Sequence, residues 1–121
     1  MKGIGTDLVD VERFRLALDR TPTLADRLFS DEERAYAATA PDPAERLAAR
    51  FAAKEAVMKA LGVGLGAFAL RDVEVVRAES GQPGVRLSGP AAALAEERGV
   101  SAWLVTLSHT TAVATATVVA L

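Results

Sequence analysis

The sequence contains no cysteine among its 121 residues. Disulfide bonds, thiolate metal sites and a cysteine nucleophile are therefore excluded, which fits a reducing compartment, and we expect a cytoplasmic protein. No apolar run reaches about 18 residues, so no membrane-spanning segment is predicted, and the chain starts without a signal-peptide layout. An excess of positive charge is also missing, since the net charge is −2. We expect no binding to nucleic acid or to an anionic membrane surface.

The length predicts one domain, residues 1–121. The composition is globular, because half of the residues are hydrophobic and a quarter are charged. A chain of this size can bury a core but has little spare surface for a deep pocket. A site for a large ligand is therefore expected between subunits.

A long helix is predicted over Ala44–Leu61. The segment is rich in Ala, Leu, Met, Lys and Glu, and Gly62 directly after the last periodic residue ends the helix. Its many alanines keep the helix slim, so that other backbone or a ligand can approach closely. Glu55 and Lys59 lie four residues apart and share one face of this helix.

The pair of Glu55 and Lys59 has two interpretations. A Glu that precedes a Lys by four residues is a favourable surface pair, worth roughly a few tenths of a kcal/mol. The glycine-rich loop Gly62–Gly66 favours a functional interpretation, because a loop with so little side-chain bulk can lie against a phosphate or a ligand chain. It is not a P-loop, since the pattern GxxxxGK[ST] is absent.

The other elements are short. Further helices are predicted over Val11–Asp19, about Ser30–Ala38 and Pro90–Arg98, with a turn or short helix over Leu24–Phe29. A capping box of Ser30 and Glu33, three residues apart, is expected to open the second of these helices. Strands are predicted over Gly3–Val9, Asp72–Ala78, Val85–Leu87, Val100–Ser108 and Ala112–Leu121. This order indicates an α+β fold in which a mostly antiparallel sheet packs on the long central helix.

Two acidic residues near the start of the chain have different expected roles. Asp10 directly precedes a helix and is expected to cap it. Asp7 lies inside a strand, where Asp is uncommon. Because Asp10 takes the capping role, Asp7 is left as a candidate functional residue.

The last strand has small apolar residues or threonines on both faces. A strand in a sheet with one solvated face should instead show polar residues on that face. We therefore expect burial on both sides, either under the helices or in a subunit interface.

Asp7, Glu55 and Lys59 together suggest a phosphate site. Carboxylates from two segments suit Mg²⁺, which proteins usually hold with one or two carboxylates plus substrate phosphates. A nearby lysine suits a phosphate as a point charge. The single histidine, His109, is at a strand end, where a lone histidine is more often structural or exposed than catalytic. The residues alone thus indicate a candidate Mg²⁺–phosphate site and no particular reaction.

The sequence resembles the holo-acyl-carrier-protein synthase family, the small trimeric class of 4′-phosphopantetheinyl transferases. The resemblance spans nearly the whole length and rests on four motifs in order. They are Gly3-Ile-Gly-Thr-Asp-Leu-Val-Asp10, Arg50-Phe-Ala-Ala-Lys-Glu-Ala-Val-Met-Lys-Ala-Leu-Gly62, Gly81-Gln-Pro83 and Val105-Thr-Leu-Ser-His-Thr110.

This resemblance implies a transferase with a defined reaction. Coenzyme A would bind with Mg²⁺ across its pyrophosphate, and a serine hydroxyl of apo-acyl-carrier protein would attack the phosphorus that bears the pantetheine arm. Adenosine 3′,5′-bisphosphate would leave, in a step that supports fatty-acid or polyketide biosynthesis. By resemblance, Asp7 and Glu55 hold the metal and Lys59 stabilises the phosphate charge. A carboxylate would take the serine proton directly or through a metal-bound water.

The resemblance also assigns binding residues and an assembly. Arg50 and His109 match positions that contact coenzyme A phosphates, and Gly64, Gly66 and Pro83 match positions that line its path. Arg13, Arg20 and Arg27 lie where the family docks the acidic carrier protein, although several acids are interspersed with them. The family implies a homotrimer with interfacial active sites.

Two other functions are compatible with the residues. One is a domain that binds coenzyme A without turnover, and the intact set of Asp7, Glu55 and Lys59 argues against it. The other is a non-catalytic oligomeric scaffold, for which the Ala-rich helix and the apolar last strand would suffice. The sequence leaves the carrier open, because fatty-acid, polyketide and peptide-synthetase carriers all offer a serine.

Overall fold

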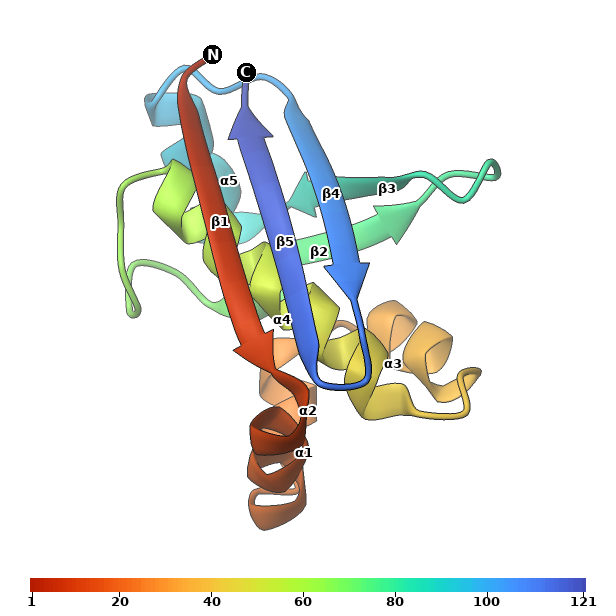
Figure 1. Ribbon diagram of the computed structural model, residues 1–121. Helices are drawn as coiled ribbons and strands as arrows, with labels where there is room; N and C mark the ends of the chain where they lie inside the picture. The colour runs from red at the N-terminus through yellow and green to blue at the C-terminus, as the bar shows by residue number, and fades with distance from the viewer.

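The computed structural model describes residues 1–121 and contains five strands, five α-helices and one 3-10 helix (Figure 1). In chain order these are β1 (Gly3–Asp10), α1 (Val11–Arg20), α2 (Leu24–Leu28), α3 (Asp31–Ala38), α4 (Pro43–Ala60), η1 (Leu70–Asp72), β2 (Val73–Arg77), β3 (Pro83–Leu87), α5 (Gly89–Glu97), β4 (Trp103–His109) and β5 (Val113–Ala120). The α+β class and the antiparallel pairing predicted from the sequence are confirmed.

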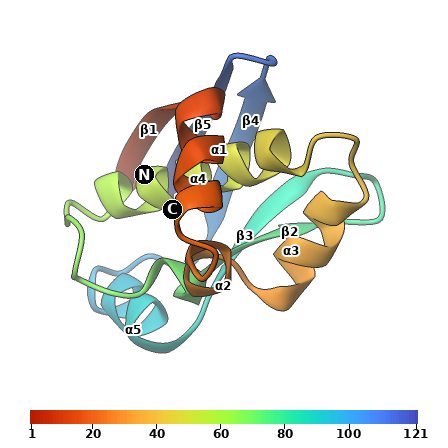
Figure 2. The same ribbon diagram turned by 90° about the horizontal axis from the view of Figure 1, so that it is seen from below.

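Two antiparallel sheets lie on different sides of α4. The larger sheet has the strand order β1-β5-β4, and β2 and β3 form a separate hairpin. Figure 2 shows α4 between the three-stranded sheet on one side and α3, α5 and the hairpin on the other. The long central helix is therefore the element to which both halves of the fold attach.

Helix α4 can hold this position because its side chains are small. Eleven of its 18 residues are buried, and most of them are alanines. Strand β1 lies so close to the helix that a Cβ at Gly5 would sit 2.0 Å from the carbonyl oxygen of Ala56, and one at Gly3 would sit 2.0 Å from that of Ala60. The expected close approach to the alanine face is thus confirmed, and backbone rather than ligand makes it.

Several element ends differ from the sequence-based expectation. Pro43 is the first residue of α4 rather than part of the preceding loop, because proline fits the first turn of a helix, where its missing N–H is not needed. Strand β4 begins at Trp103 and includes His109. Val100 does not join it, because its N–H donates to the carbonyl of Ala95 at the end of α5.

The outer face of the three-stranded sheet is uncovered within one chain. Along β5, alternate residues from Ala114 to Ala120 are buried against α4, and the residues between them are half-exposed. On the neighbouring strands Ile4, Leu8 and Leu104 are more than half exposed. The sequence predicts that β5 is buried on both faces. Within one chain, only the face that packs on α4 is buried.

None of the helices is both long and apolar enough to cross a membrane.

Candidate active site

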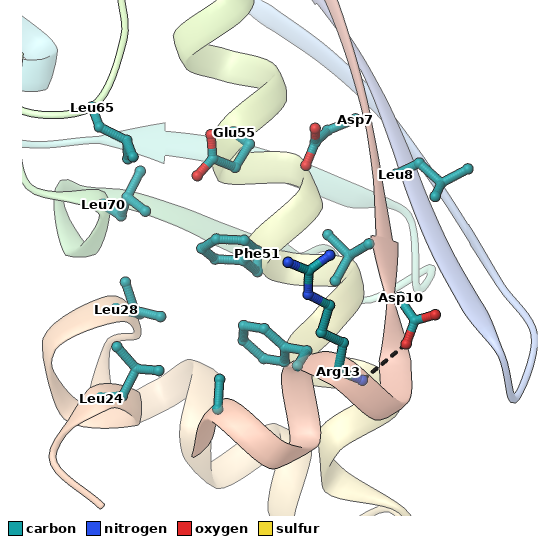
Figure 3. Close-up of a pocket in the computed structure, with 13 residues that line it drawn as sticks. Asp7, Leu8, Asp10, Arg13, Leu24, Leu28, Phe51, Glu55, Leu65 and Leu70 are labelled. Carbon is teal, nitrogen blue, oxygen red and sulfur yellow. Dashed lines mark hydrogen bonds between the residues drawn. The ribbon is translucent and has the colours of Figure 1, made fainter. Parts of the chain in front are cut away.

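The predicted acidic pair lies in one pocket. Asp7 comes from β1 and Glu55 from α4, and both carboxylates line a pocket of about 710 Å³ (Figure 3). Asp7 is on the strand face that turns toward α4, between Gly5 and Val9. This explains why a strand carries an aspartate: the close approach of β1 to the helix brings Asp7 beside the face of α4 that bears Glu55.

Lys59 contacts β1 rather than Glu55. Its Nζ donates to Asp7 Oδ1 at 3.0 Å and to the backbone carbonyl of Thr6 at 2.9 Å. The surface pair with Glu55 that the spacing allowed does not form. Lys59 therefore lies at the rim of the pocket with its charge next to the acidic pair, while about half of its side chain stays exposed.

Burial and the neighbouring carboxylate of Asp7 raise the pKa of Glu55, and the charge of Lys59 partly opposes this. No group of the chain donates a hydrogen bond to the Glu55 carboxylate. A partly buried carboxylate with a raised pKa and a second acid beside it is typical of a functional site rather than of a stabilising contact.

The donor set of the pocket fits a magnesium ion. Both ligands are carboxylates, and no cluster of three or more His, Cys, Asp or Glu residues stands ready to hold a metal without help. Mg²⁺ is usually held by one or two protein carboxylates, with waters and substrate phosphates as the other ligands. Asp7 and Glu55 would hold the ion, and a phosphate-bearing ligand would complete its coordination.

Apart from Asp10 and Arg13, the other residues that line the acidic pocket are apolar. Leu8, Phe14, Phe51 and Leu70 are among the nine hydrophobic residues that line it. Leu65 reaches the pocket from the loop between Gly64 and Gly66, which is exposed. A side chain at either glycine would meet no atom within 4 Å, and Gly66 has a φ of +96°. Leu65 is thus the residue of the glycine loop that lines the acidic pocket.

A second group of predicted residues lies on another side of α4. Arg50, Pro83 and His109 line one hollow of about 280 Å³ together with Tyr36 and Arg77. This hollow shares no lining residue with the acidic pocket. Arg50 and Glu55 are five residues apart on the helix, which turns their side chains about 140° from each other.

Arg50 is a buried cation without a partner. Only 4% of it is exposed, and its Nε is buried with no hydrogen-bond acceptor. Its guanidinium lies over the ring of Tyr36 at 4.5 Å, and those of Arg46 and Arg77 lie over the same ring at 4.3 and 4.9 Å. Burial lowers the pKa of Arg50, the charges of Glu33 and Tyr36 partly oppose this, and the charges of Arg77 and Arg46 add to the effect of burial. Three positively charged guanidinium groups around one ring favour the binding of an anion.

His109 has a partner within the chain. Its Nδ1 lies 2.5 Å from Glu45 Oε1, so the ring is oriented by a carboxylate from the start of α4. The other ring nitrogen remains available for a ligand at the edge of the hollow.

The three arginines predicted to dock a carrier protein are exposed on α1 and α2. Arg13 extends from α1 into the acidic pocket (Figure 3), while Arg20 and Arg27 lie outside it. None of the three forms an ion pair within the chain, in contrast to Arg15 on the same helix, which pairs with Asp42 and Glu12.

Sequence reasoning missed the buried ion pair of Lys54 and Glu33, in which both side chains are fully buried. Lys54 reads as a surface residue in a Lys-Glu dipeptide, and Glu33 was expected only as the acidic member of a capping box. Tyr36, Arg46 and Arg77 were missed as well, because they come from three elements. No local pattern signals these contacts.

Comparison with known proteins places this fold and site in a class. The chain belongs to the 4′-phosphopantetheinyl transferase superfamily, whose family model matches residues 3–118.

Within that superfamily, the chain is similar to proteins named holo-[acyl-carrier-protein] synthase. It is 52% identical to that of Salinispora arenicola over 97% of this chain and 95% of the relative, and 51% identical to that of Streptomyces griseus over 98% and 96%. Among solved structures, holo-[acyl-carrier-protein] synthase of Neisseria meningitidis superposes with a TM-score of 0.90 at 32% identity, covering 100% of this chain and 98% of the other. The Helicobacter pylori enzyme in complex with coenzyme A gives 0.86 at 27% identity, with coverage of 98% and 99%.

Proposed function

We propose that Asp7, Glu55 and Lys59 form the catalytic centre of a holo-[acyl-carrier-protein] synthase. The enzyme moves 4′-phosphopantetheine from coenzyme A to a serine hydroxyl of apo-acyl-carrier protein. Similarity to synthases of that name over nearly the full chain supports the reaction, as does the coenzyme A bound to the Helicobacter pylori enzyme. The observation that carries the site assignment is the meeting of two carboxylates in a single pocket, with Lys59 bonded to one of them.

The reaction replaces the phosphoanhydride bond of coenzyme A with a phosphodiester bond to serine. The serine oxygen attacks the phosphorus that bears the pantetheine arm, the bond from that phosphorus to the bridging oxygen breaks, and adenosine 3′,5′-bisphosphate leaves with the bond's electron pair. Phosphoryl transfer depends mainly on positioning and charge neutralisation. Lys59 supplies a positive charge at the pocket rim, where it can move from Asp7 to a phosphate oxygen.

Asp7 and Glu55 would hold Mg²⁺, which when bound neutralises charge on the pyrophosphate and fixes its orientation. Glu55, whose pKa is raised by burial and by Asp7, can accept the serine proton directly or through a water.

The hollow around Arg50 is suited to the phosphate groups at the other end of coenzyme A. Arg50 has no anionic partner of its own, and a phosphate there would satisfy its buried guanidinium. His109 and Pro83 border the same space. Gly64 and Gly66 border the path on the acidic side.

One chain presents these two halves on different sides of α4, so we place the complete site between two subunits of a homotrimer. The uncovered outer face of the β1-β5-β4 sheet supports this assembly, since it exposes Ile4, Leu8 and Leu104. Packing of three such faces around an axis would cover β5 on its second side. The acidic half of one subunit would then face the cationic half of the next.

The partner protein is expected to be acidic. Arg13, Arg20 and Arg27 are exposed and free of intrachain ion pairs, and such charges guide the encounter with an oppositely charged surface. Because Arg13 also lines the acidic pocket, a carrier docked on α1 would have its serine near Glu55. A role in fatty-acid or polyketide synthesis and a cytoplasmic location follow from this proposal and stay predictions.

Mass spectrometry of a panel of apo-carrier proteins tests the function. Incubation with the enzyme, coenzyme A and Mg²⁺ should add one phosphopantetheine group to at least one carrier, and chelation of the metal should stop the addition. Calorimetric binding of coenzyme A with no transfer to any carrier would indicate the non-catalytic alternative. Absence of both binding and transfer would indicate a scaffold.

A further inference from the structure

Lys54 is a buried charge that the proposed mechanism does not use. Its side chain is fully buried, and Nζ donates to Glu33 Oε1 at 2.8 Å, to the backbone carbonyl of Leu70 at 3.2 Å and to that of Val73. An ammonium group has three protons, so all of its donors are engaged.

Glu33 ties the same contact to other elements. Its Oε1 also accepts from the backbone N–H of Ser30 at 3.0 Å, and its Oε2 accepts from that of Val75 at 3.1 Å. The pair of Lys54 and Glu33 therefore links the start of α3 and the middle of α4 to η1 and β2.

Stability alone is a weak reason for this arrangement. A buried ion pair often stabilises a fold no better than apolar residues of similar volume, because both charges lose their hydration. The places that Lys54 connects point to another role. Lys54 directly precedes Glu55 on α4, and its acceptor Leu70 lines the acidic pocket. Figure 3 shows Glu55 between Leu70 and Leu65 on one side and Asp7 on the other.

Contacts on two faces of this part of α4 hold the walls of the acidic pocket in place, and Lys54 makes those on the face away from β1. Gly3 and Gly5 hold β1, and with it Asp7, against one face of the helix. The carbonyls of Leu70 and Val73 are held by Lys54 from another face. The segment that follows the glycine loop runs into η1 at Leu70, so the same side chain fixes the end of this segment to α4.

We propose that Lys54 is a positioning residue that fixes the wall of the acidic pocket relative to Glu55. This inference rests on the proposed function, since it assigns the pocket to Mg²⁺ and coenzyme A. Loss of the two carbonyl contacts should let η1 and the glycine loop move away from Glu55 and weaken the binding of the metal together with coenzyme A. Removal of such supporting contacts typically costs about 10- to 100-fold in metal affinity or activity.

Two variants separate positioning from stability. Glu33→Gln removes the carboxylate charge but leaves Lys54 bonded to the carbonyls of Leu70 and Val73. The double variant Glu33→Gln with Lys54→Met removes both charges, so that no uncompensated charge stays buried. Both variants should have a lower melting temperature than the wild type, so melting temperature does not distinguish the positioning role from a role in stability.

The distinguishing measurements are the Mg²⁺ concentration at half-maximal transfer and the ratio of coenzyme A affinities with and without Mg²⁺ by calorimetry, taken well below each melting temperature. We expect Glu33→Gln to match the wild type in both. The double variant should need about 10- to 100-fold more Mg²⁺ and lose most of the affinity gained from the metal. Wild-type values in the double variant would overturn the positioning role, and so would equal losses in both variants. A wild type without transfer or metal-dependent binding would instead overturn the proposed function.

Discussion

The two sides of helix α4 carry opposite charges. On one side Asp7 and Glu55 share a pocket with Lys59 at its rim. On the other side Arg50, Arg46 and Arg77 gather around Tyr36, and the buried Nε of Arg50 has no acceptor. Each side is electrostatically incomplete, since like charges are held together with too few counter-charges.

The difference shows how a small chain can bind a large ligand. A ligand with several phosphates satisfies the cationic side directly and the acidic side through a metal ion. Because the two sides face apart on one helix, the proposed assembly uses two copies of the chain to bring them together. The uncovered sheet face supplies a surface for that assembly.

The largest effect is expected from breaking the assembly, which separates the two sides altogether. Thr117 lies on the outer face of β5, where its hydroxyl is 3.2 Å from that of Thr6. Thr117→Glu would place an unpaired charge in the proposed interface, which is costly. The variant should be monomeric by light scattering and have no detectable transfer. Ser80→Glu, in the exposed hairpin turn, is the control and should stay trimeric and active. A monomeric, active Thr117→Glu would contradict the assembly.

Next in size is the loss of Lys59 on the acidic side. If this lysine neutralises charge that develops in the transition state, Lys59→Met should lower kcat by about 10²–10³-fold with a small change in the KM for coenzyme A. Steady-state kinetics at saturating Mg²⁺ provide the measurement. A change confined to KM would make Lys59 a binding residue only.

A smaller effect is expected from the cationic side. Arg50→Met removes the buried charge and keeps an apolar stem against Tyr36. A charged hydrogen bond to a phosphate is worth enough to raise the KM for coenzyme A by about 10- to 100-fold, with kcat little changed. Kinetics at several coenzyme A concentrations separate the two constants. If kcat fell and KM stayed constant, Arg50 would belong to the chemical step.

The smallest effect concerns stability and pH. Burial and Asp7 raise the pKa of Glu55 in the folded chain, so its ionisation disfavours folding. This penalty is absent below the pKa of the unfolded chain and grows as the pH rises to the raised folded value. Glu55→Gln should therefore gain melting temperature relative to the wild type between acidic pH and pH 7 in the absence of Mg²⁺, although it loses activity.

Thermal melts over that pH range check this, with Glu79→Gln on the exposed hairpin turn as the control. A constant difference between Glu55→Gln and the wild type at all pH values would mean that the carboxylate carries no such penalty.

Sequence patterns predicted what depends on neighbours along the chain. The cap at Asp10 is confirmed, since the N–H of Arg13 donates to its carboxylate at 2.8 Å, and the box of Ser30 and Glu33 forms as well. The central helix also lies where its composition predicts. These features need only helix geometry and a residue three or four positions away.

Contacts between distant segments could not be predicted in this way. Spacing alone favoured a pair of Glu55 and Lys59, yet Lys59 bonds β1 because the glycines let that strand lie against the helix. The burial of Lys54 depends on Glu33, which lies 21 residues away in sequence. The candidate site residues divide between two sides of α4. The sequence did not predict this division, because it depends on how the elements pack.

Complementation between variants tests the shared site most directly. Glu55→Ala disables the acidic half and Arg50→Met the cationic half, so each alone should transfer poorly when coenzyme A is far below the raised KM. In trimers assembled by co-refolding equal amounts, about a quarter of the interfaces would combine two intact halves. This mixture should recover roughly that fraction of wild-type activity. A mixture no more active than the mean of the two variants would contradict it, because both halves of each site would then belong to the same chain.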